Sequence, residues 1–205
     1  MRPRLFVVTG PSGAGKGTLI RKLVRERPDL AVAVSATTRA RRPGEEDGRD
    51  YHFLAEEEFL RRVEAGDFLE HVEYVSGHRY GTLRDEVDHI LASGRSAVLE
   101  LETEGAKEVQ RTSPDAVTIF IQAPSFDELE RRLGERATES AGEIGERLEL
   151  ARRQAEEAGD FDYVVTNDEL TRAVGEVGAI VDKALRAPDA KAPLRQELEG
   201  AERCR

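Results

Sequence analysis

The chain has 205 residues, of which 39% are hydrophobic and 35% are charged, and its formal net charge is −10. These values are typical of one soluble globular domain, and no apolar run is long enough to span a membrane. The negative charge argues against nucleic acid as a partner, and the single cysteine, Cys204, indicates a reducing, cytoplasmic setting.

The first predicted element is a buried strand, Leu5–Thr9, followed by a glycine-rich loop and a helix. The loop reads Gly10-Pro11-Ser12-Gly13-Ala14-Gly15-Lys16-Gly17-Thr18. Such a loop between strand and helix turns successive backbone N–H groups into one concavity, which binds the phosphates of a nucleotide. Lys16 is expected to reach the outer phosphates. Gly17 stands where this loop usually carries a hydroxyl residue.

A second group of candidate binding residues follows the second predicted strand, Ala31–Ser35. Ligands of open parallel sheets sit beyond the carboxyl ends of the strands. Arg39 and Arg42 can each hold a phosphate with a planar guanidinium fork, and the Ser35 hydroxyl adds a neutral donor. The sequence therefore predicts a second anion site near the first.

Residues 36–82 interrupt the alternation of strands and helices. They contain polar turns and short strand-like pieces, Tyr51–Leu54 and Phe68–Tyr74. This pattern predicts an inserted, smaller, β-rich subdomain.

Three further strands complete the prediction: Ala97–Leu101, Val117–Ile121 and Tyr163–Thr166. Their continuous apolar runs favour an α/β fold with a five-stranded, mostly parallel sheet flanked by helices. The last helix follows Asp168, which we expect to be its N-cap. An earlier helix is predicted to bury the stripe Ile144, Leu148, Ala151 and Ala155.

In their order and spacing, these motifs resemble the guanylate kinase family. The segments that carry the resemblance are Gly10–Thr18, Ser35–Glu45, Tyr51-His52-Phe53, Phe68-Leu69-Glu70, Tyr80-Gly81-Thr82, Val98–Ala106, the arginine-rich stretch after Leu129, and Tyr163–Asp168. The resemblance runs from Leu5 to about Leu185. It implies a P-loop enzyme of purine nucleotide metabolism that transfers the terminal phosphoryl group of ATP to GMP, giving ADP and GDP.

The resemblance also implies a domain organisation. A single domain would occupy residues 1–187, with a core of residues 1–35, 83–133 and 150–187. Residues 36–82 would be the GMP-binding insertion and residues 134–149 a mobile helical lid. The tail, residues 188–205, is expected to be disordered because it is rich in charge and contains Pro193.

For ATP, the resemblance implies the whole loop from Gly10 to Thr18 and Asn167, which would lie near the adenine. The catalytic cations it implies are Lys16, Arg39, Arg132, Arg136 and Arg147, the last three from the lid. Mg²⁺ would bridge the ATP phosphates. Because Gly17 lacks a hydroxyl, we expect phosphates and water to hold most of the metal's coordination, with help from Thr18 or Glu100.

For GMP, the resemblance implies that the Glu70 carboxylate accepts from guanine N1–H and the exocyclic amine. Thr82 would contact the guanine edge, and Glu100 and Glu102 would lie nearby. The remaining GMP-binding residues are Ser35, Arg39, Arg42, Tyr51 and Tyr80. Glu102 is one methylene longer than the aspartate usual in the family, and Glu104 replaces the usual glutamine.

Three alternatives stay open at this stage: a related kinase acting on a phosphorylated ribose, a non-catalytic guanylate-kinase-like interaction module, and a generic P-loop ATPase. The expected partners are small molecules, with no nucleic acid and no membrane. The sequence leaves open the oligomeric state and the choice between GMP and dGMP.

Overall fold

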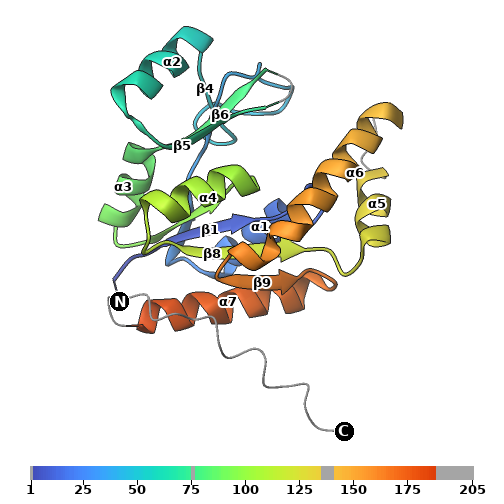
Figure 1. Cartoon of the computed structure of the whole chain (residues 1–205). Helices are drawn as coiled ribbons and strands as arrows, with labels where there is room; N and C mark the ends of the chain where they lie inside the picture. The colour runs from blue at the N-terminus through green and yellow to red at the C-terminus, as the bar shows by residue number, and fades with distance from the viewer. Residues whose placement is uncertain (1, 75–76, 135–140, 188–205) are drawn as a thin grey trace, which may run out of the picture.

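The computed structural model of the protein describes residues 2–74, 77–134 and 141–187, which form two β-sheets covered by helices (Figure 1). The larger sheet has five strands in the order β2-β7-β1-β8-β9. Their bounds are β1 Leu5–Thr9, β2 Leu30–Val32, β7 Ser96–Glu100, β8 Val117–Gln122 and β9 Tyr163–Thr166. Every pairing in this sheet is parallel, which confirms the predicted fold class.

The second strand is shorter than predicted. β2 ends at Val32, so Ser35 lies beyond the strand rather than at its end. The chain crosses here to the smaller sheet, where the Ser35 carbonyl accepts a hydrogen bond from the His52 N–H at 2.9 Å. The apolar residues that follow Val32 therefore lie in the connection between the two sheets and not in the strand.

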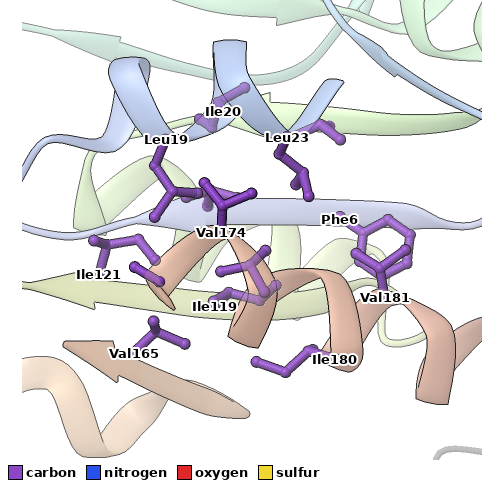
Figure 2. Close-up of a cluster of buried hydrophobic side chains, with 14 of the residues drawn as sticks. Phe6, Leu19, Ile20, Leu23, Ile119, Ile121, Val165, Val174, Ile180 and Val181 are labelled. Carbon is purple, nitrogen blue, oxygen red and sulfur yellow. The ribbon is translucent and has the colours of Figure 1, made fainter. Parts of the chain in front are cut away.

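Helices cover both faces of the larger sheet because its strands are apolar on both sides. One face is packed by α1 (Lys16–Glu26) and α7 (Leu170–Arg186). Figure 2 shows Leu19 and Leu23 of α1 and Val174 of α7 pointing toward the strand residues Phe6 and Ile119. The other face is packed by α3 (Arg84–Ala92) and α4 (Thr103–Thr112).

The N-cap of α7 differs from the prediction. Glu169, not Asp168, caps the helix, and its carboxylate accepts from the backbone N–H groups of Thr171 and Arg172. Asp168 instead pairs with the Arg172 side chain, with 2.6 Å between carboxylate and guanidinium. Two adjacent acidic residues can each serve as a cap, and sequence spacing alone does not choose between them.

The smaller sheet has four strands in the order β4-β3-β6-β5. Their bounds are β3 Ala36–Thr37, β4 His52–Phe53, β5 Phe68–Glu73 and β6 Arg79–Leu83. Helix α2 (Glu56–Ala65) packs on this sheet through Phe59, whose ring lies 4.4 Å from that of Phe68. This apolar cluster packs the smaller sheet and is separate from the clusters that pack the larger one.

Two further helices stand beyond β8. They are α5 (Phe126–Gly134) and α6 (Ala141–Glu156), and a short 3₁₀ helix, η1 (Glu157–Asp160), leads from α6 to β9 (Figure 1). Leu129 and Leu133 of α5 pack against Ala151 of α6. The predicted apolar stripe of α6 is wrong at Ala155, which is exposed while the neighbouring Gln154 is buried, and the side chain of Ile144 lies outside the described residues.

Parts of the predicted lid and tail lie outside the described residues. Residues 135–140, which include Arg136, and residues 188–205 belong to this group, and so does the side chain of Arg147. Within the described part of the chain, the helices are too short or too polar to cross a lipid bilayer.

A glycine at the centre of the smaller sheet provides a test of this packing. A Cβ on Gly81 would lie 2.7 Å from Phe68 Cδ1 and 2.8 Å from the Glu70 carbonyl oxygen. We expect Gly81→Ala to lower the free energy of unfolding by about 1–3 kcal/mol, because overpacking forces β5 and β6 apart. Denaturant unfolding measures this change.

Gly175 is the matched control. It is exposed in the interior of α7, with open space where a Cβ would be built. Gly175→Ala is expected to raise the free energy of unfolding by up to about 1 kcal/mol through helix propensity alone. Equal stability of the two variants would contradict the packing described for Gly81.

Candidate active site

The glycine-rich loop joins β1 to α1 at the carboxyl edge of the larger sheet, and two of its glycines are required by their surroundings. Gly10 has φ of 135°, and a Cβ there would overlap the Ile121 carbonyl oxygen of β8. Gly15 has φ of 88°, and a Cβ there would lie 2.5 Å from Asn167 Nδ2. The loop is thus held against the ends of β8 and β9 with no room for a side chain at these two positions.

Lys16, the first residue of α1, is folded back onto this loop. Its side chain is buried, and its ammonium donates to the carbonyl oxygens of Gly10 at 2.6 Å and Pro11 at 3.2 Å. The N-cap Gly15 offers no side-chain acceptor, and the first turn of α1 carries no acidic residue. Positive charge and unpaired helix N–H groups therefore face one concavity, which favours an anion.

A cavity of about 370 Å³ opens beside the loop, and we call it the loop cavity. It is lined by Gly13, Gly15, Thr18, Arg132, Asn167, Asp168 and Leu170. Asn167 donates from Nδ2 to the Ala14 carbonyl oxygen at 2.8 Å, which ties β9 to the loop. Arg132 of α5 reaches the same place, donating to the Asn167 carbonyl oxygen at 3.1 Å and to Glu128 at 2.7 Å.

A second cavity, about 80 Å³, lies between the two sheets, and we call it the carboxylate cavity. It is lined by Ser35, Tyr51, Glu70, Val72, Tyr74, Tyr80, Gly81, Glu100, Leu101, Glu102 and Gly105. Six of the residues predicted to bind one ligand are therefore brought together, and Thr82 contacts the cavity through Glu70. Three carboxylates in one small cavity indicate a ligand that donates hydrogen bonds.

Glu70 is the most buried of these carboxylates, with 4% of its surface exposed. The Thr82 hydroxyl donates to Glu70 Oε1 at 2.8 Å, and Glu70 Oε2 lies 2.7 Å from where a Cβ of Gly105 would be. Burial raises the pKa of Glu70 from 4.5 to about 7, against the lowering effect of the Thr82 hydrogen bonds. The free protein therefore holds a carboxyl group that titrates near neutral pH and lacks a cationic partner in the described structure.

Phenols also line the carboxylate cavity, and one guanidinium lies beside them. Tyr51 and Tyr80 are in edge contact at 5.9 Å, and the Arg39 guanidinium lies 5.4 Å from the centre of the Tyr51 ring. Glu45 holds Arg39 with two hydrogen bonds of 2.8 and 3.1 Å. This pairing raises the pKa of Arg39 and fixes its guanidinium beside the phenols. Arg42 is exposed, and its backbone N–H donates to Glu45 at 2.8 Å.

Glu100 at the end of β7 lies between the carboxylate cavity and the start of α1. It lines the carboxylate cavity, and its two carboxylate oxygens lie 3.2 and 3.3 Å from where a Cβ of Gly17 would be. A hydroxyl residue at position 17 would press against this carboxylate. The glycine thus leaves room for Glu100 at the start of α1.

The sequence interpretation missed two parts of this site. Gly105 was assigned no role, although its lack of a side chain admits Glu70 Oε2. Tyr74 lines the carboxylate cavity and stands in edge contact with Tyr80 at 5.2 Å. Neither position has a local sequence signal, because each depends on the pairing of segments far apart in the chain.

Comparisons with known proteins agree in identifying one family. A family model described as guanylate kinase matches residues 2–184. A protein of Rubrobacter xylanophilus named guanylate kinase is 50% identical over 188 residues, which cover 92% of this chain and 98% of the relative. The guanylate kinase of Thermotoga maritima is 40% identical over 204 residues, 98% of each chain.

A solved structure gives the same result for the fold. The crystal structure of guanylate kinase from Anaplasma phagocytophilum matches with a TM-score of 0.74 at 29% sequence identity. The match covers 90% of this chain and 87% of that one. Both kinds of similarity span nearly the whole chain, from β1 to α7.

The raised pKa of Glu70 predicts how stability depends on pH. Because the pKa is 4.5 in the unfolded chain and about 7 in the folded one, the folded protein binds more protons between these values. The contribution of Glu70 to stability therefore falls as pH rises from 4.5 to about 7 and is constant above. At about 1.4 kcal/mol per pKa unit, the total loss is about 3 kcal/mol.

Glu70→Gln removes this charge while keeping the shape of the side chain. We expect the variant to be more stable than the wild type by about 2–3 kcal/mol at pH 8 and by less than about 1 kcal/mol at pH 5. Urea unfolding at the two pH values measures the difference. Glu64→Gln, at an exposed position of α2, is the control for the same change of side chain. A difference for Glu70→Gln that does not change with pH would refute the assigned pKa.

Proposed function

The chain belongs to the guanylate kinase family and phosphorylates GMP to GDP at the expense of ATP; from this premise, we propose that the loop cavity binds ATP and the carboxylate cavity binds GMP. The observation that carries the assignment is the position of Glu100. One side chain borders the carboxylate cavity and stands at the start of α1, directly after the phosphate-binding loop. The phosphates of the two substrates would meet there.

We assign the ATP phosphates to the loop from Gly10 to Thr18. Lys16 would exchange its two carbonyl partners for phosphate oxygens, because charge-assisted hydrogen bonds to phosphate are stronger than neutral ones. Arg132 would approach from α5, and Asn167 would lie near the adenine. Arg136 and Arg147 are proposed to complete the cationic surroundings from the lid, residues 134–149.

We assign guanine to the end of the carboxylate cavity that holds Glu70. Guanine presents one N–H at N1 and two at the exocyclic amine, and adenine lacks this set of donors on the same edge. Glu70 would accept from N1–H and one amine hydrogen, and Glu102 from the other, while Thr82 and Ser35 contact the edge of the base. A buried acceptor left without its donor costs about 1–3 kcal/mol, which discriminates against adenine.

We assign the GMP phosphate to the end that holds the guanidinium and the phenols. Arg39, Tyr51 and Tyr80 already stand together there, and Arg42 lies on the same turn. Glu45 keeps the Arg39 fork in place before the phosphate arrives. The smaller sheet, residues 36–82, would then be the GMP-binding part of a single domain over residues 1–187.

The chemistry needs no protein nucleophile. An oxygen of the GMP phosphate attacks the terminal phosphorus of ATP, and the bond from that phosphorus to the bridging oxygen of ADP breaks. The protein supplies alignment and positive charge, which are the main terms in phosphoryl transfer. Lys16 and Arg39 would offset the charge on the two phosphate groups from opposite sides.

Magnesium fits the residues at this point. Glu100 offers carboxylate oxygens beside Gly17, and the Thr18 hydroxyl is on the next residue, so oxygen donors stand where the phosphates of ATP would lie. When bound, Mg²⁺ neutralises phosphate charge. We propose that it is held mainly by phosphates and water, and that the reaction serves purine metabolism in the cytoplasm. The family match does not favour the alternatives of a ribose-phosphate kinase or an interaction module.

Two variants test the assignment in one assay of ADP release from ATP with GMP or AMP. Lys16→Ala should lower kcat by about 10²–10³-fold with either acceptor, because it removes a cation from the reacting phosphates. Glu70→Gln should lower kcat/KM for GMP by about 10–100-fold and leave the low activity with AMP within about twofold.

The two variants are expected to change activity with GMP and AMP in different ways, so the assay tests the two assignments separately. Loss of AMP activity and GMP activity in equal proportion in Glu70→Gln would contradict the assignment of guanine to the carboxylate cavity. Wild-type kcat in Lys16→Ala would contradict the assignment of the ATP phosphates to the loop. Glu64→Gln serves again as the control for a changed surface charge.

A further inference from the structure

A buried amide on α6 reaches the carboxylate cavity from outside. Gln154 is 6% exposed, although its neighbours Arg153 and Ala155 on the same helix are exposed. Its Nε2 donates to Glu102 Oε2 at 2.9 Å, a contact that joins α6 to the start of α4 (Figure 1). Burying an amide costs free energy unless it is paired, so this contact is a specific one.

The Glu102 carboxylate is positioned by distant partners and not by its own helix. Glu102 is the N-cap residue of α4, yet its side chain makes no capping hydrogen bond. A carboxylate at an N-cap ordinarily accepts from the N–H groups of the first turn. Here it is turned toward Gln154, so the surrounding residues, and not the backbone of α4, determine its orientation.

Tyr74, next to the smaller sheet, lines the same two cavities as this carboxylate. Burial raises the pKa of the Tyr74 phenol, and the charge and hydrogen bonding of Glu102 raise it further. The hydroxyl therefore remains protonated beside the Glu102 carboxylate, and both residues line the carboxylate cavity. Glu102 thus accepts from a residue of α6 and lies beside a residue that directly follows β5, and these two residues are far apart in sequence.

These three side chains form a wall between two cavities. Glu102 and Tyr74 line the carboxylate cavity, and with Gln154 they also line a cavity of about 400 Å³ on the α6 side. The amide must present its N–H₂ group to the carboxylate, so its Oε1 faces away and has no hydrogen-bond partner among the described residues. Without Gln154, Glu102 could turn into the larger cavity and away from Glu70.

We propose that Gln154, together with Tyr74, is a positioning residue for guanine recognition, because it holds the Glu102 carboxylate where that group accepts from the exocyclic amine of GMP. This inference rests on the proposed assignment of guanine to the carboxylate cavity. Gln154 does not touch the substrate in this account. It acts through Glu102, so recognition of the base depends on the position of α6.

Inosine monophosphate isolates the predicted effect, because it keeps N1–H but carries hydrogen in place of the exocyclic amine. Gln154→Met keeps the length of the side chain and removes the donor. We expect kcat/KM for GMP to fall about tenfold through KM, while kcat and the KM for ATP stay within about twofold. The kcat/KM for inosine monophosphate should be unchanged, so the preference for GMP should fall about tenfold.

Three further variants complete the experiment. Glu102→Gln should show the same loss of preference, and adding Gln154→Met to it should cause no further loss, since the two residues act in series. Tyr74→Phe should shift the preference in the same direction and keeps the inference testable if Gln154→Met is poorly folded. Gln110→Met, which removes a half-buried amide that donates to the Asp160 carbonyl oxygen, should leave the activity with both acceptors unaffected.

The outcomes separate this inference from the proposed function. If Gln154→Met lowers kcat/KM equally for both acceptors, or if the effects of Gln154→Met and Glu102→Gln add, Gln154 has only a structural role and the inference is wrong. If Glu102→Gln leaves the preference unchanged while Glu70→Gln reduces GMP activity, the inference fails and the proposed function stands. If Glu70→Gln also leaves GMP activity unchanged, the assignment of guanine to this cavity fails as well.

Discussion

The burial of an ionisable carboxylate, that of Glu70, is the constraint on which the arrangement of the smaller sheet depends; Glu70 is 4% exposed. Gly81 lets β5 and β6 approach so that Glu70 and Thr82 face each other, and Gly105 leaves space for the second carboxylate oxygen. This arrangement gives the free protein a group whose charged form is unfavourable until a donor arrives. The protein is therefore less stable at neutral pH, but it presents a hydrogen-bond acceptor to which the edge of guanine can donate.

The rest of the site depends on where the larger sheet ends. The phosphate-binding loop follows β1, Glu100 ends β7, and Asn167 follows β9, so three segments far apart in sequence meet at one carboxyl edge. Glu100 places this edge in contact with the carboxylate cavity. The transfer of a phosphoryl group between two polyanions needs this proximity together with cations, and in the proposed assignment Lys16 and Arg39 supply positive charge from the two substrate sides.

Much of the fold was predictable because its signals are local. Continuous apolar runs identified the five parallel strands, and glycine spacing identified the loop, whose φ angles at Gly10 and Gly15 only glycine adopts readily. The wrong predictions concern the ends of two elements, where neighbouring residues were equally compatible with the sequence pattern. Glu169 rather than Asp168 caps α7, and β2 ends at Val32 because the chain crosses to the other sheet. The limits of the proposed insertion and lid remain predictions.

Lys16 could be predicted from the loop that carries it, whereas Glu70 was predicted only from the resemblance to the family. Gln154 gave no such signal, since an amide on a charged helix is ordinarily exposed, and its burial follows from a contact with Glu102 52 residues away. Calorimetric titration of GMP at pH 7, in buffers of different ionisation enthalpy, tests the central claim about Glu70 most directly. Binding to the wild type should release about half a proton more than binding to Glu70→Gln, because half of the Glu70 carboxyls are protonated at that pH. Equal proton release by the two proteins would contradict it.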